Sequence, residues 1–583
     1  MCRIAGIVDN RRYQDQLINE VDFMVKSMIH GGPDANGIYS NKEFAFGHCR
    51  LSIIDLSESA SQPMLDKVSG NVISFNGEIY NYKEIKSELL KLNHEFSTNS
   101  DTEVILKAYN QWGVKSFGKF NGMFAFSLYD KKKNLVYLVR DPNGIKLLYY
   151  STTNDQLIFA SEIKAFKGIV DDEFEEWKVL FLTYGFIPEP YTKIKDVLSL
   201  DVSSYLEYDI LSKKHITRKY NYSIDSNDTY QFRNYDDLKI RLIESVDRHL
   251  ISDASIGVFL SGGIDSSLLS ILASLSIECV NTLSINFTES EYTEKKYQDL
   301  IVKLIESKHF EYQLNEIDFD LSIERIYASY DSPSNDGINT WFISKFASEN
   351  GIKAVLSGLG ADELFGGYPS FNRYKYLKFL HLSNGLIKIG SRLLNRNYLR
   401  LEFLNVDEDI ADYLLLRGFY TPSEVSKILG LSVQDVIYIL NNFKPNASRR
   451  VESIEDISFL ETNMYMRNQL LRDSDVMSMR HGVEIRVPLL DNEFLHFVRN
   501  IKPEILYNEP GKKSLLINSF ADTLPEQIWN RPKKGFQFPF KLWMKKSEFV
   551  RSKMDGQMKN KQFELFIKDK LHWSKIWTLA QIN

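Results

Sequence analysis

The sequence predicts two domains of different fold class, an α+β half followed by an α/β half with a helical extension. Three observations carry this prediction. The chain has 583 residues, more than one hydrophobic core of about 100 to 200 residues usually holds. Short strand-like runs fill residues 1 to about 210. Apolar runs alternate with helical segments in the second half.

The first half reads as antiparallel sheet with a few helices. Residues 71–80, 121–130 and 134–140 are alternating or wholly apolar runs, and Gly, Asn and Asp turns separate them. Such runs between turn residues are typical of strands. Residues 213–235 are polar and lack a period, so we expect a linker there between domains at 1–212 and 236–583.

The second half reads as a parallel sheet covered on both faces. Four apolar runs at 256–262, 281–287, 309–315 and 352–358 alternate with helical segments such as 265–276 and 294–307. Strands buried on both faces read as continuous hydrophobic stretches, and their alternation with helices favours a parallel sheet. Beyond residue 370 the sequence is Leu-rich and helical, so we expect a helical extension there.

Composition excludes several classes of protein. The chain is 43% hydrophobic and 25% charged, and no apolar run approaches the roughly 18 residues of a membrane span. A net charge of -6 gives no electrostatic reason for nucleic-acid binding. The ten histidines lack the spacing of a zinc site, and the start lacks the pattern of a signal peptide. Three cysteines cannot form a disulfide framework, so we expect a cytoplasmic protein.

Cys2 stands directly behind the initiator methionine. After removal of Met1, this residue would carry both a thiol nucleophile and an α-amine whose pKa is about 7.7 to 8. One residue would then hold a nucleophile and its base. The alternative is that Cys2 is only a small hydrophobic residue.

The run "GVFLSGGIDSSLL" predicts a phosphate site where a buried strand ends and a helix begins. Glycines let backbone N–H groups approach an anion, and the helix N-terminus adds donors and its dipole. An acidic residue beside such a site fits a magnesium ion that bridges carboxylate and phosphate. The alternative is a Gly-Gly turn with serine caps. The candidate residues are Ser261, Gly262, Gly263, Asp265, Ser266 and Ser267.

A second loop, "LSGLGADELFGGYP", follows the fourth apolar run. Ligands of open α/β sheets bind outside the carboxyl ends of the strands, so Ser357, Gly358, Asp362 and Glu363 would face the same crevice. Two acidic loops can then share a metal ion. Alternatively, Asp362 and Glu363 are only an acidic pair that the helix dipole stabilises.

Taken together, these motifs resemble the glutamine-dependent asparagine synthetase family over nearly the whole chain. Its landmarks recur in order as "MCRIAGI", "HGGPDANG", "HCRLSIIDL", "FNGEIYN", "NSDTEV", "FNGMFAFSLYD", "RDPNGIK", "FASEIKA", "LSGGIDSS", "LSGLGADELFGGY", "LRDSDVMSMRHGVEIRVPLLD" and "RPKKGFQFPFKLW". The resemblance implies a class II glutamine amidotransferase domain of the N-terminal-nucleophile hydrolase fold. It implies a Rossmann-like ATP-pyrophosphatase domain for the second half.

For the first domain, the resemblance implies that Cys2 attacks the side-chain amide of glutamine and releases ammonia. Asn76, through its side chain, and Gly77, through its backbone N–H, would stabilise the oxyanion. Arg50 would bind the α-carboxylate of glutamine, while Glu78 and Asp101 would accept from its α-ammonium. Leu51, Ser52, Ile53 and Ile54 would complete the glutamine pocket.

For the second domain, the resemblance implies ATP over Leu260 and Ile285, with its phosphates on residues 261–267. Ser357 and Gly358 would touch the nucleotide, and Asp265 and Asp362 would hold Mg²⁺. A carboxylate would attack the α-phosphorus, pyrophosphate would leave, and ammonia would trap the acyl-adenylate. Lys513 matches a lysine near the adenylate, but its neighbour Lys512 leaves that assignment open.

Four positions depart from the family pattern. Leu359 replaces the usual acidic residue of "SG(D/E)G", Asp473 a usual lysine, Gly31 the arginine of "HRGPD", and Leu147 a usual proline. Leu359 and Asp473 lie in the second half and leave the identity of the acceptor open. Family precedent favours aspartate, and a sugar uronate or another small acid is the rival. A catalytically silent scaffold and an enzyme that uses only free ammonia also stay open, as do the role of residues 531–543 and the oligomeric state, a homodimer included.

Overall fold

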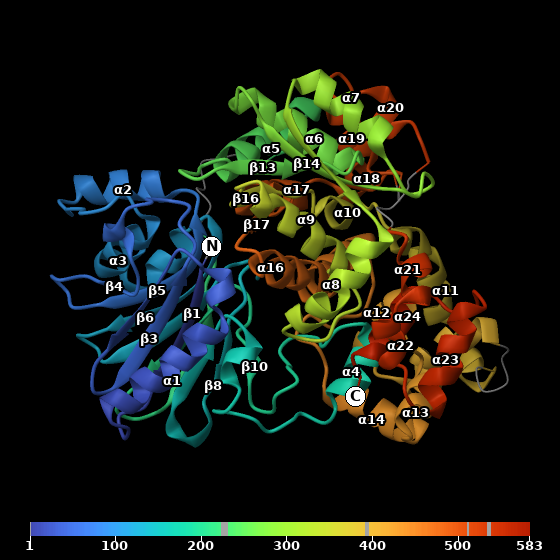
Figure 1. The fold of residues 1–583 in the computed structure, drawn as a ribbon, viewed down its shortest axis with the longest axis horizontal. Helices are drawn as coiled ribbons and strands as arrows, with labels where there is room; N and C mark the ends of the chain where they lie inside the picture. The colour runs from blue at the N-terminus through green and yellow to red at the C-terminus, as the bar shows by residue number, and fades with distance from the viewer. Residues whose placement is uncertain (1, 223–230, 391–395, 510–511, 533–537, 583) are drawn as a thin grey trace.

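The structure is a computed structural model that describes residues 2–222, 231–390, 396–509, 512–532 and 538–582. Figure 1 shows two six-stranded antiparallel sheets on one side of the molecule and a five-stranded parallel sheet with many helices on the other. None of the helices in the described ranges is long and apolar enough to span a bilayer.

Two antiparallel sheets form the N-terminal domain, and the predicted strands in 71–80, 121–130 and 134–140 are confirmed as neighbours in one of them. The first sheet has the order β10 (Leu198–Ser199), β8 (Tyr149–Ser151), β9 (Leu157–Ala160), β1 (Arg3–Val8), β3 (Phe44–Arg50), β2 (Ala35–Ser40). The second has the order β12 (His215–Lys219), β11 (Ser204–Asp209), β7 (Leu135–Arg140), β6 (Gly122–Asp130), β5 (Val72–Ile79), β4 (Met64–Leu65).

The two sheets pack face to face, with helices on their outer faces. Inward-facing side chains such as Ile4 and Phe46 of the first sheet meet Ala125 and Leu138 of the second in one buried cluster. Helix α1 (Gln14–Ser27) covers the outer face of the first sheet. Helices α2 (Tyr82–Lys91) and α3 (Asp101–Trp112) cover the second. Strands buried in this way are apolar on both faces, which explains their continuous hydrophobic runs.

The beginning of the segment expected to be a linker is a strand. Residues His215–Lys219 form β12, an edge strand that pairs antiparallel with β11. All five of its residues are exposed, so its sequence carries no apolar signal. Residues 223–230 lie outside the described residues. Helix α5 (Tyr235–His249) begins at a capping box in which the side chain of Asn234 accepts from the amides of Asp236 and Asp237.

The parallel sheet of the second domain is confirmed, and its strand order is β15-β14-β13-β16-β17. Three of the four predicted runs contain β13 (Ile256–Phe259), β14 (Asn281–Phe287) and β16 (Ala354–Leu356). The remaining strand, β15 (Lys308–Leu314), begins one residue before its predicted run at 309–315. The fifth strand, β17 (Glu484–Arg486), comes from much later in the chain and pairs with β16. Helices beside this sheet are α5, α6 (Ile264–Ser276), α7 (Lys295–Ile305), α8 (Glu316–Ser329), α9 (Ile338–Glu349) and α10 (Ala361–Leu364).

The predicted helical extension is also confirmed and lies mostly away from the antiparallel sheets (Figure 1). One helix of the first half, α4 (Trp177–Tyr184), packs among its members and shares their core. One helix of the extension, α16 (Arg472–Met479), lies between the two domains in Figure 1. The extension consists of α11 (Pro369–Gly390), α12 (Glu408–Arg417), α13 (Pro422–Leu429), α14 (Val433–Asn442), α15 (Ile454–Leu460), α16 (Arg472–Met479), α17 (Asn492–Arg499), α18 (Pro503–Leu506), α19 (Ser514–Ser519), α20 (Glu526–Trp529), α21 (Phe540–Lys546), α22 (Glu548–Ser552), α23 (Gln557–Ile567) and α24 (Trp573–Ala580).

Candidate active sites

Cys2 lies at the wall of a small cavity of about 30 Å³, directly before strand β1. The structure brings most of the predicted glutamine-binding residues to this cavity. Two predicted residues, Ser52 and Asn76, are not in its wall. The backbone amide of Ser52 donates to Asp34 Oδ2 at 2.7 Å. Predicted residues in the wall are Cys2, Arg50, Leu51, Ile53, Ile54, Gly77, Glu78 and Asp101. Residues that sequence reasoning missed are Ala60, Gln62, Phe75, Ser100 and Thr102.

The main-chain nitrogen of Cys2 donates to Asn76 Oδ1 at 3.1 Å. Asn76 is fully buried, and its Nδ2 has no hydrogen-bond partner among the described residues. Gly77 follows with a φ of +145°, and a Cβ there would lie 2.1 Å from the carbonyl oxygen of Met123. Only glycine fits this close approach. An amide donor and a glycine N–H beside a thiol form an arrangement that can stabilise an oxyanion.

The charged groups of this cavity are largely buried. Arg50 donates to the carbonyl oxygens of Ser57, at 2.8 Å, and Asp55. Burial raises the pKa of Asp101 to about 7 and raises the pKa of the Cys2 thiol. A thiol of this kind needs a local base to become a nucleophile, and an α-amine on the same residue is one.

Glu78 connects this cavity to the second domain. Burial and the nearby Glu484 carboxylate raise the pKa of Glu78 well above its ordinary value. Arg486 Nη2 lies 3.6 Å from Glu78 Oε1, and Arg486 Nε lies 2.6 Å from Glu484 Oε1. Both Glu484 and Arg486 belong to β17, so the edge strand of the parallel sheet lies beside the Cys2 cavity.

The predicted phosphate loop lies between β13 and α6 and opens on a cavity of about 290 Å³. Six loop residues were predicted, and four of them reach its wall. Gly262, with a φ of +85°, does not; its carbonyl oxygen accepts from Arg531 Nη2 at 2.8 Å. Ser267 is fully buried inside α6. Predicted residues in the wall are Leu260, Ser261, Gly263, Asp265, Ser266, Ile285, Ser357, Gly358, Asp362 and Glu363.

Lys513 joins the two acidic loops. Its Nζ lies 2.6 Å from Asp265 Oδ2 and 2.8 Å from Asp362 Oδ1. Burial alone would lower the pKa of Lys513, but the two carboxylates raise it above its ordinary value. Lys512 points elsewhere, since its side chain is 73% exposed and pairs with Glu509 at 3.0 Å. The geometry therefore favours Lys513 over Lys512 at this site.

The donor set at the two acidic loops fits Mg²⁺. One ammonium contacts both Asp265 and Asp362, so the two carboxylates face the same point. In the described part of the chain, no three His, Cys, Asp or Glu side chains gather as a metal cage. Magnesium typically takes one or two carboxylates and completes its shell with waters and substrate phosphates, and it needs no such cage.

Leu359 and Glu363 share the wall of the 290 Å³ cavity. Glu363 is buried and accepts from Tyr368 Oη at 2.7 Å. Burial, and next the charge of Asp362, raises the pKa of Glu363 to about 7. Asp473 is not in the wall; it is buried and accepts from Ser334 Oγ. The acid missing at position 359 thus has a buried acidic neighbour within the same cavity.

Arg531 is a functional candidate that sequence reasoning missed. Besides the carbonyl of Gly262, its guanidinium pairs with Glu294 at 2.8 Å and stacks 3.6 Å from the ring of Tyr297. It lines a third, larger cavity of about 860 Å³, which shares Ser261 and Asp265 with the 290 Å³ cavity. Its neighbours Lys533 and Lys534 lie outside the described residues. The sequence left the role of residues 531–543 open, because nothing near Arg531 in the sequence identifies Gly262, Glu294 or Tyr297 as its contacts.

Comparison with known proteins agrees with the two-domain division. Residues 1–221 match the glutamine amidotransferase domain, and residues 237–579 match asparagine synthase. A Bacillus subtilis (strain 168) protein named glutamine-hydrolysing asparagine synthetase 1 is 31% identical, over 95% of this chain and 89% of its own length. Glutamine-hydrolysing asparagine synthetase 3 of the same strain is 28% identical over 92% and 87%. A Gibberella zeae protein named amidase chry2 is 25% identical over 91% and 86%. The chain thus belongs to the asparagine synthase family.

Proposed function

We propose that this protein is a glutamine-hydrolysing, ATP-dependent ligase that converts a carboxylate into an amide. The observation that carries the proposal is a pair of sites. One is the cavity at Cys2, whose main-chain nitrogen donates to Asn76. The other is the cavity at the Ser261 loop and Asp265, the carboxylate that Lys513 contacts. The first domain, which we assign to residues 1–212 and to the N-terminal-nucleophile hydrolase fold, would release ammonia. The second, residues 236–583, would use it.

In the first cavity the Cys2 thiolate attacks the side-chain amide carbon of glutamine. The α-amine of Cys2, freed by removal of Met1, takes the thiol proton and passes it to the departing ammonia. The oxyanion lies against Asn76 Nδ2 and the N–H of Gly77. Water then cleaves the thioester to glutamate. Arg50 binds the α-carboxylate of glutamine, and Glu78 and Asp101 accept from its α-ammonium.

In the second cavity ATP lies over Leu260 and Ile285 with its phosphates on the Ser261 loop. The acceptor carboxylate attacks the α-phosphorus, the bond to the β-phosphate breaks, and pyrophosphate leaves. Ammonia then displaces AMP from the acyl-adenylate. Lys513 stabilises the charge that develops on the phosphates. Mg²⁺, when bound by Asp265 and Asp362, would neutralise phosphate charge during this transfer.

We favour aspartate as the acceptor, since two relatives that match nearly the whole chain bear asparagine synthetase names. The rival is a sugar uronate or another small acid. Leu359 supports the rival, because a leucine cannot pair with the ammonium of aspartate. A relative of similar length coverage bears the name amidase chry2 and not an asparagine synthetase name, which also keeps the rival open.

The experiment is product analysis by mass spectrometry after incubation with ATP, Mg²⁺ and amide-labelled glutamine. One arm contains aspartate and the other a panel of uronates. Labelled asparagine, with AMP and pyrophosphate in equal amounts, would support aspartate. AMP that forms only with a uronate would support the rival. Glutamate without any amide product in either arm would contradict the proposed ligase.

Two controls separate the remaining functions. A Cys2→Ala variant should lose glutamine-dependent synthesis and keep synthesis from added ammonium, because the two cavities are separate. Wild-type protein that makes the amide from added ammonium and none from glutamine would identify an enzyme that uses only free ammonia. Intact-mass analysis tests the silent scaffold, because retained Met1 would block the α-amine of Cys2.

A further inference from the structure

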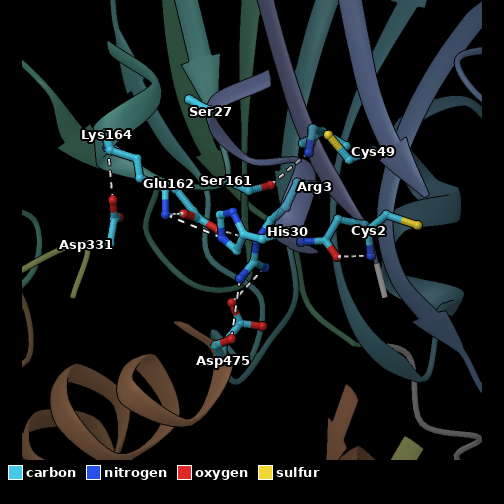
Figure 2. Close-up of polar contacts among 12 residues, drawn as sticks. Cys2, Arg3, Ser27, His30, Cys49, Ser161, Glu162, Lys164, Asp331 and Asp475 are labelled. Carbon is cyan, nitrogen blue, oxygen red and sulfur yellow. Dashed lines mark hydrogen bonds and ion pairs between the residues drawn. The ribbon is translucent and has the colours of Figure 1, made fainter. Parts of the chain in front are cut away.

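Arg3 is a buried cation that follows the Cys2 nucleophile directly. It is fully buried, and its Nε lies 2.7 Å from Glu162 Oε1. Its Nη1 lies 2.8 Å from Asp475 Oδ2, and its Nη2 donates to the carbonyl oxygen of Asp475 at 3.3 Å. Figure 2 shows Arg3 between these two acids, with Asp475 on the helix of the second domain. A single side chain thus bridges the two domains.

The acid on the near side of Arg3 is itself held in place. Glu162 pairs with Lys164 and, at 3.2 Å, with His30 Nε2. Asp331, from the second domain, accepts from the amides of Ile163 at 2.6 Å and Lys164 at 2.9 Å. These contacts fix Glu162 and its turn against the second domain. The guanidinium of Arg3 is therefore held from both sides, by Glu162 of the first domain and by Asp475 of the second.

Arg3 also fills the space that a side chain at position 31 would occupy. A Cβ on Gly31 would lie 2.8 Å from Arg3 Cγ and 3.0 Å from Arg3 Nε. This is the position where the family pattern "HRGPD" places an arginine. In this chain the arginine side chain beside position 31 comes from Arg3 of β1, and Gly31 leaves space for it because it has no side chain.

The Arg3–Asp475 pair links the two cavities through adjacent residues. Cys2, one residue before Arg3, lines the first cavity. Ser474, one residue before Asp475, lines the second. A buried pair contributes little net stability, since desolvation of both charges offsets their attraction, but it fixes one geometry because neither charge can stay buried alone. Such a pair is better suited to positioning than to stabilisation.

We propose that Arg3 is a positioning residue for glutamine hydrolysis: by anchoring β1 to Asp475 on α16, it sets the place of Cys2 from the synthetase domain. This inference rests on the proposed function. A shift of the nucleophile by a fraction of an ångström changes its alignment with the amide carbon while leaving the groups that bind glutamine in place. The residue acts through Cys2 and touches no substrate.

The experiment compares wild type, Arg3→Met, Asp475→Leu and the double variant Arg3→Met/Asp475→Leu in the full-length protein. Glutamine hydrolysis without acceptor gives kcat and KM, and thermal unfolding gives stability. Each single variant should lower kcat by up to about 100-fold and leave KM for glutamine unchanged. Both singles should lose stability, and the double variant should regain most of it. Glu162 keeps its contacts with Lys164 and His30 there, and the contact that stays lost is the one between Lys146 Nζ and Asp475 Oδ1, at 3.6 Å.

The double variant decides between positioning and structure. If Arg3 positions Cys2, kcat stays low in the double variant although its stability returns. Recovery of kcat together with stability would overturn the inference, as would single variants with wild-type kcat. If Arg3→Met does not fold, Asp475→Asn, which keeps the side-chain size and leaves Arg3 paired with Glu162, should still lower kcat.

A matched control breaks another contact between the domains. Asn143 Nδ2 donates to Asn492 Oδ1 at 2.9 Å and to the carbonyl oxygen of Leu490 at 3.0 Å. Asn143→Ala should leave kcat unchanged, and an equal loss there would overturn the special role of Arg3. A wild-type protein that hydrolyses no glutamine would instead refute the proposed function and the inference with it.

Discussion

Asn76 accepts a hydrogen bond from the main-chain nitrogen of Cys2 through Oδ1 and keeps its buried Nδ2 without a partner among the described residues. A buried donor left unpaired costs free energy unless a ligand satisfies it. In the proposed mechanism, Oδ1 of Asn76 orients the α-amine of Cys2 and Nδ2 donates to the oxyanion.

Asn76→Ala is expected to lower kcat for glutamine hydrolysis by about 100- to 1000-fold, the usual loss for one oxyanion donor. KM for glutamine should change little, because Arg50 and Asp101 remain. Steady-state kinetics of ammonia release measure both constants. A loss that appears in KM alone would show that Asn76 binds the substrate and does not stabilise the oxyanion.

Lys513→Met is expected to abolish ATP-dependent synthesis while glutamine hydrolysis persists, because Lys513 contacts Asp265 and Asp362 and is not in the wall of the Cys2 cavity. Removing the ammonium leaves Asp265 and Asp362 facing each other, and breaking such a buried pairing costs about 3 to 5 kcal/mol. Added Mg²⁺ should therefore raise the Tm of the variant more than that of wild type.

The matched control for this prediction is the neighbouring exposed residue. Lys512→Met should keep both activities and respond to Mg²⁺ as wild type does, since the ammonium of Lys512 is exposed and pairs with Glu509. Thermal unfolding with and without Mg²⁺ checks both variants. An equal Mg²⁺ response in Lys513→Met and wild type would contradict the assignment of Asp265 and Asp362 as its ligands.

Asp473→Asn is expected to stabilise the protein at alkaline pH. Burial raises the pKa of Asp473 to about 8, whereas an unfolded aspartate has a pKa of about 3.9. The folded state thus holds a proton that the unfolded state releases, so this residue's contribution to stability is complete below about pH 4 and is lost as pH rises to about 8. Asparagine carries no such proton and can still accept from Ser334.

Thermal unfolding from pH 5 to pH 9 tests this prediction. The Tm advantage of Asp473→Asn over wild type should grow with pH up to about 8 and then level off. If Asp473→Asn and wild type have the same rate of amide synthesis at pH 7, the side chain at position 473 takes no part in the reaction. A Tm difference that does not change with pH would mean that Asp473 is ionised in the folded state.

The sequence predicted the parts of the fold that local pattern determines. The buried strands β13, β14 and β16 appear as continuous apolar runs because helices cover both faces of their sheet. Two strands escaped for opposite reasons. Strand β12 is wholly exposed, so it has no apolar face to reveal it. Strand β17 is three residues long and contains Glu484 and Arg486, whose burial depends on their mutual ion pair.

The candidate sites follow the same division. Asn76, Gly77 and Asp265 were predicted because each stands in a short motif that can be recognised from neighbouring residues alone. Contacts between distant segments were not predicted. Arg3 and Asp475, for example, are 472 positions apart, and the sequence around each of them does not indicate that they pair. The lysine at the acidic loops needed the fold as well, since only burial separates Lys513 from Lys512.

Gly31→Ala tests the fit between position 31 and Arg3. The added Cβ would lie 2.8 Å from Arg3 Cγ, closer than side chains pack, and Arg3 cannot yield because Glu162 and Asp475 hold its guanidinium. We expect a destabilisation of about 1 to 3 kcal/mol, typical of overpacking, and a lower kcat for glutamine hydrolysis. In an Arg3→Ala background no Cγ remains, so the same Gly31→Ala change should have no further effect. Unfolding and kinetics of the four proteins complete this cycle. An equal loss in both backgrounds would show that the backbone at Gly31, and not the packing of Arg3, excludes a side chain there.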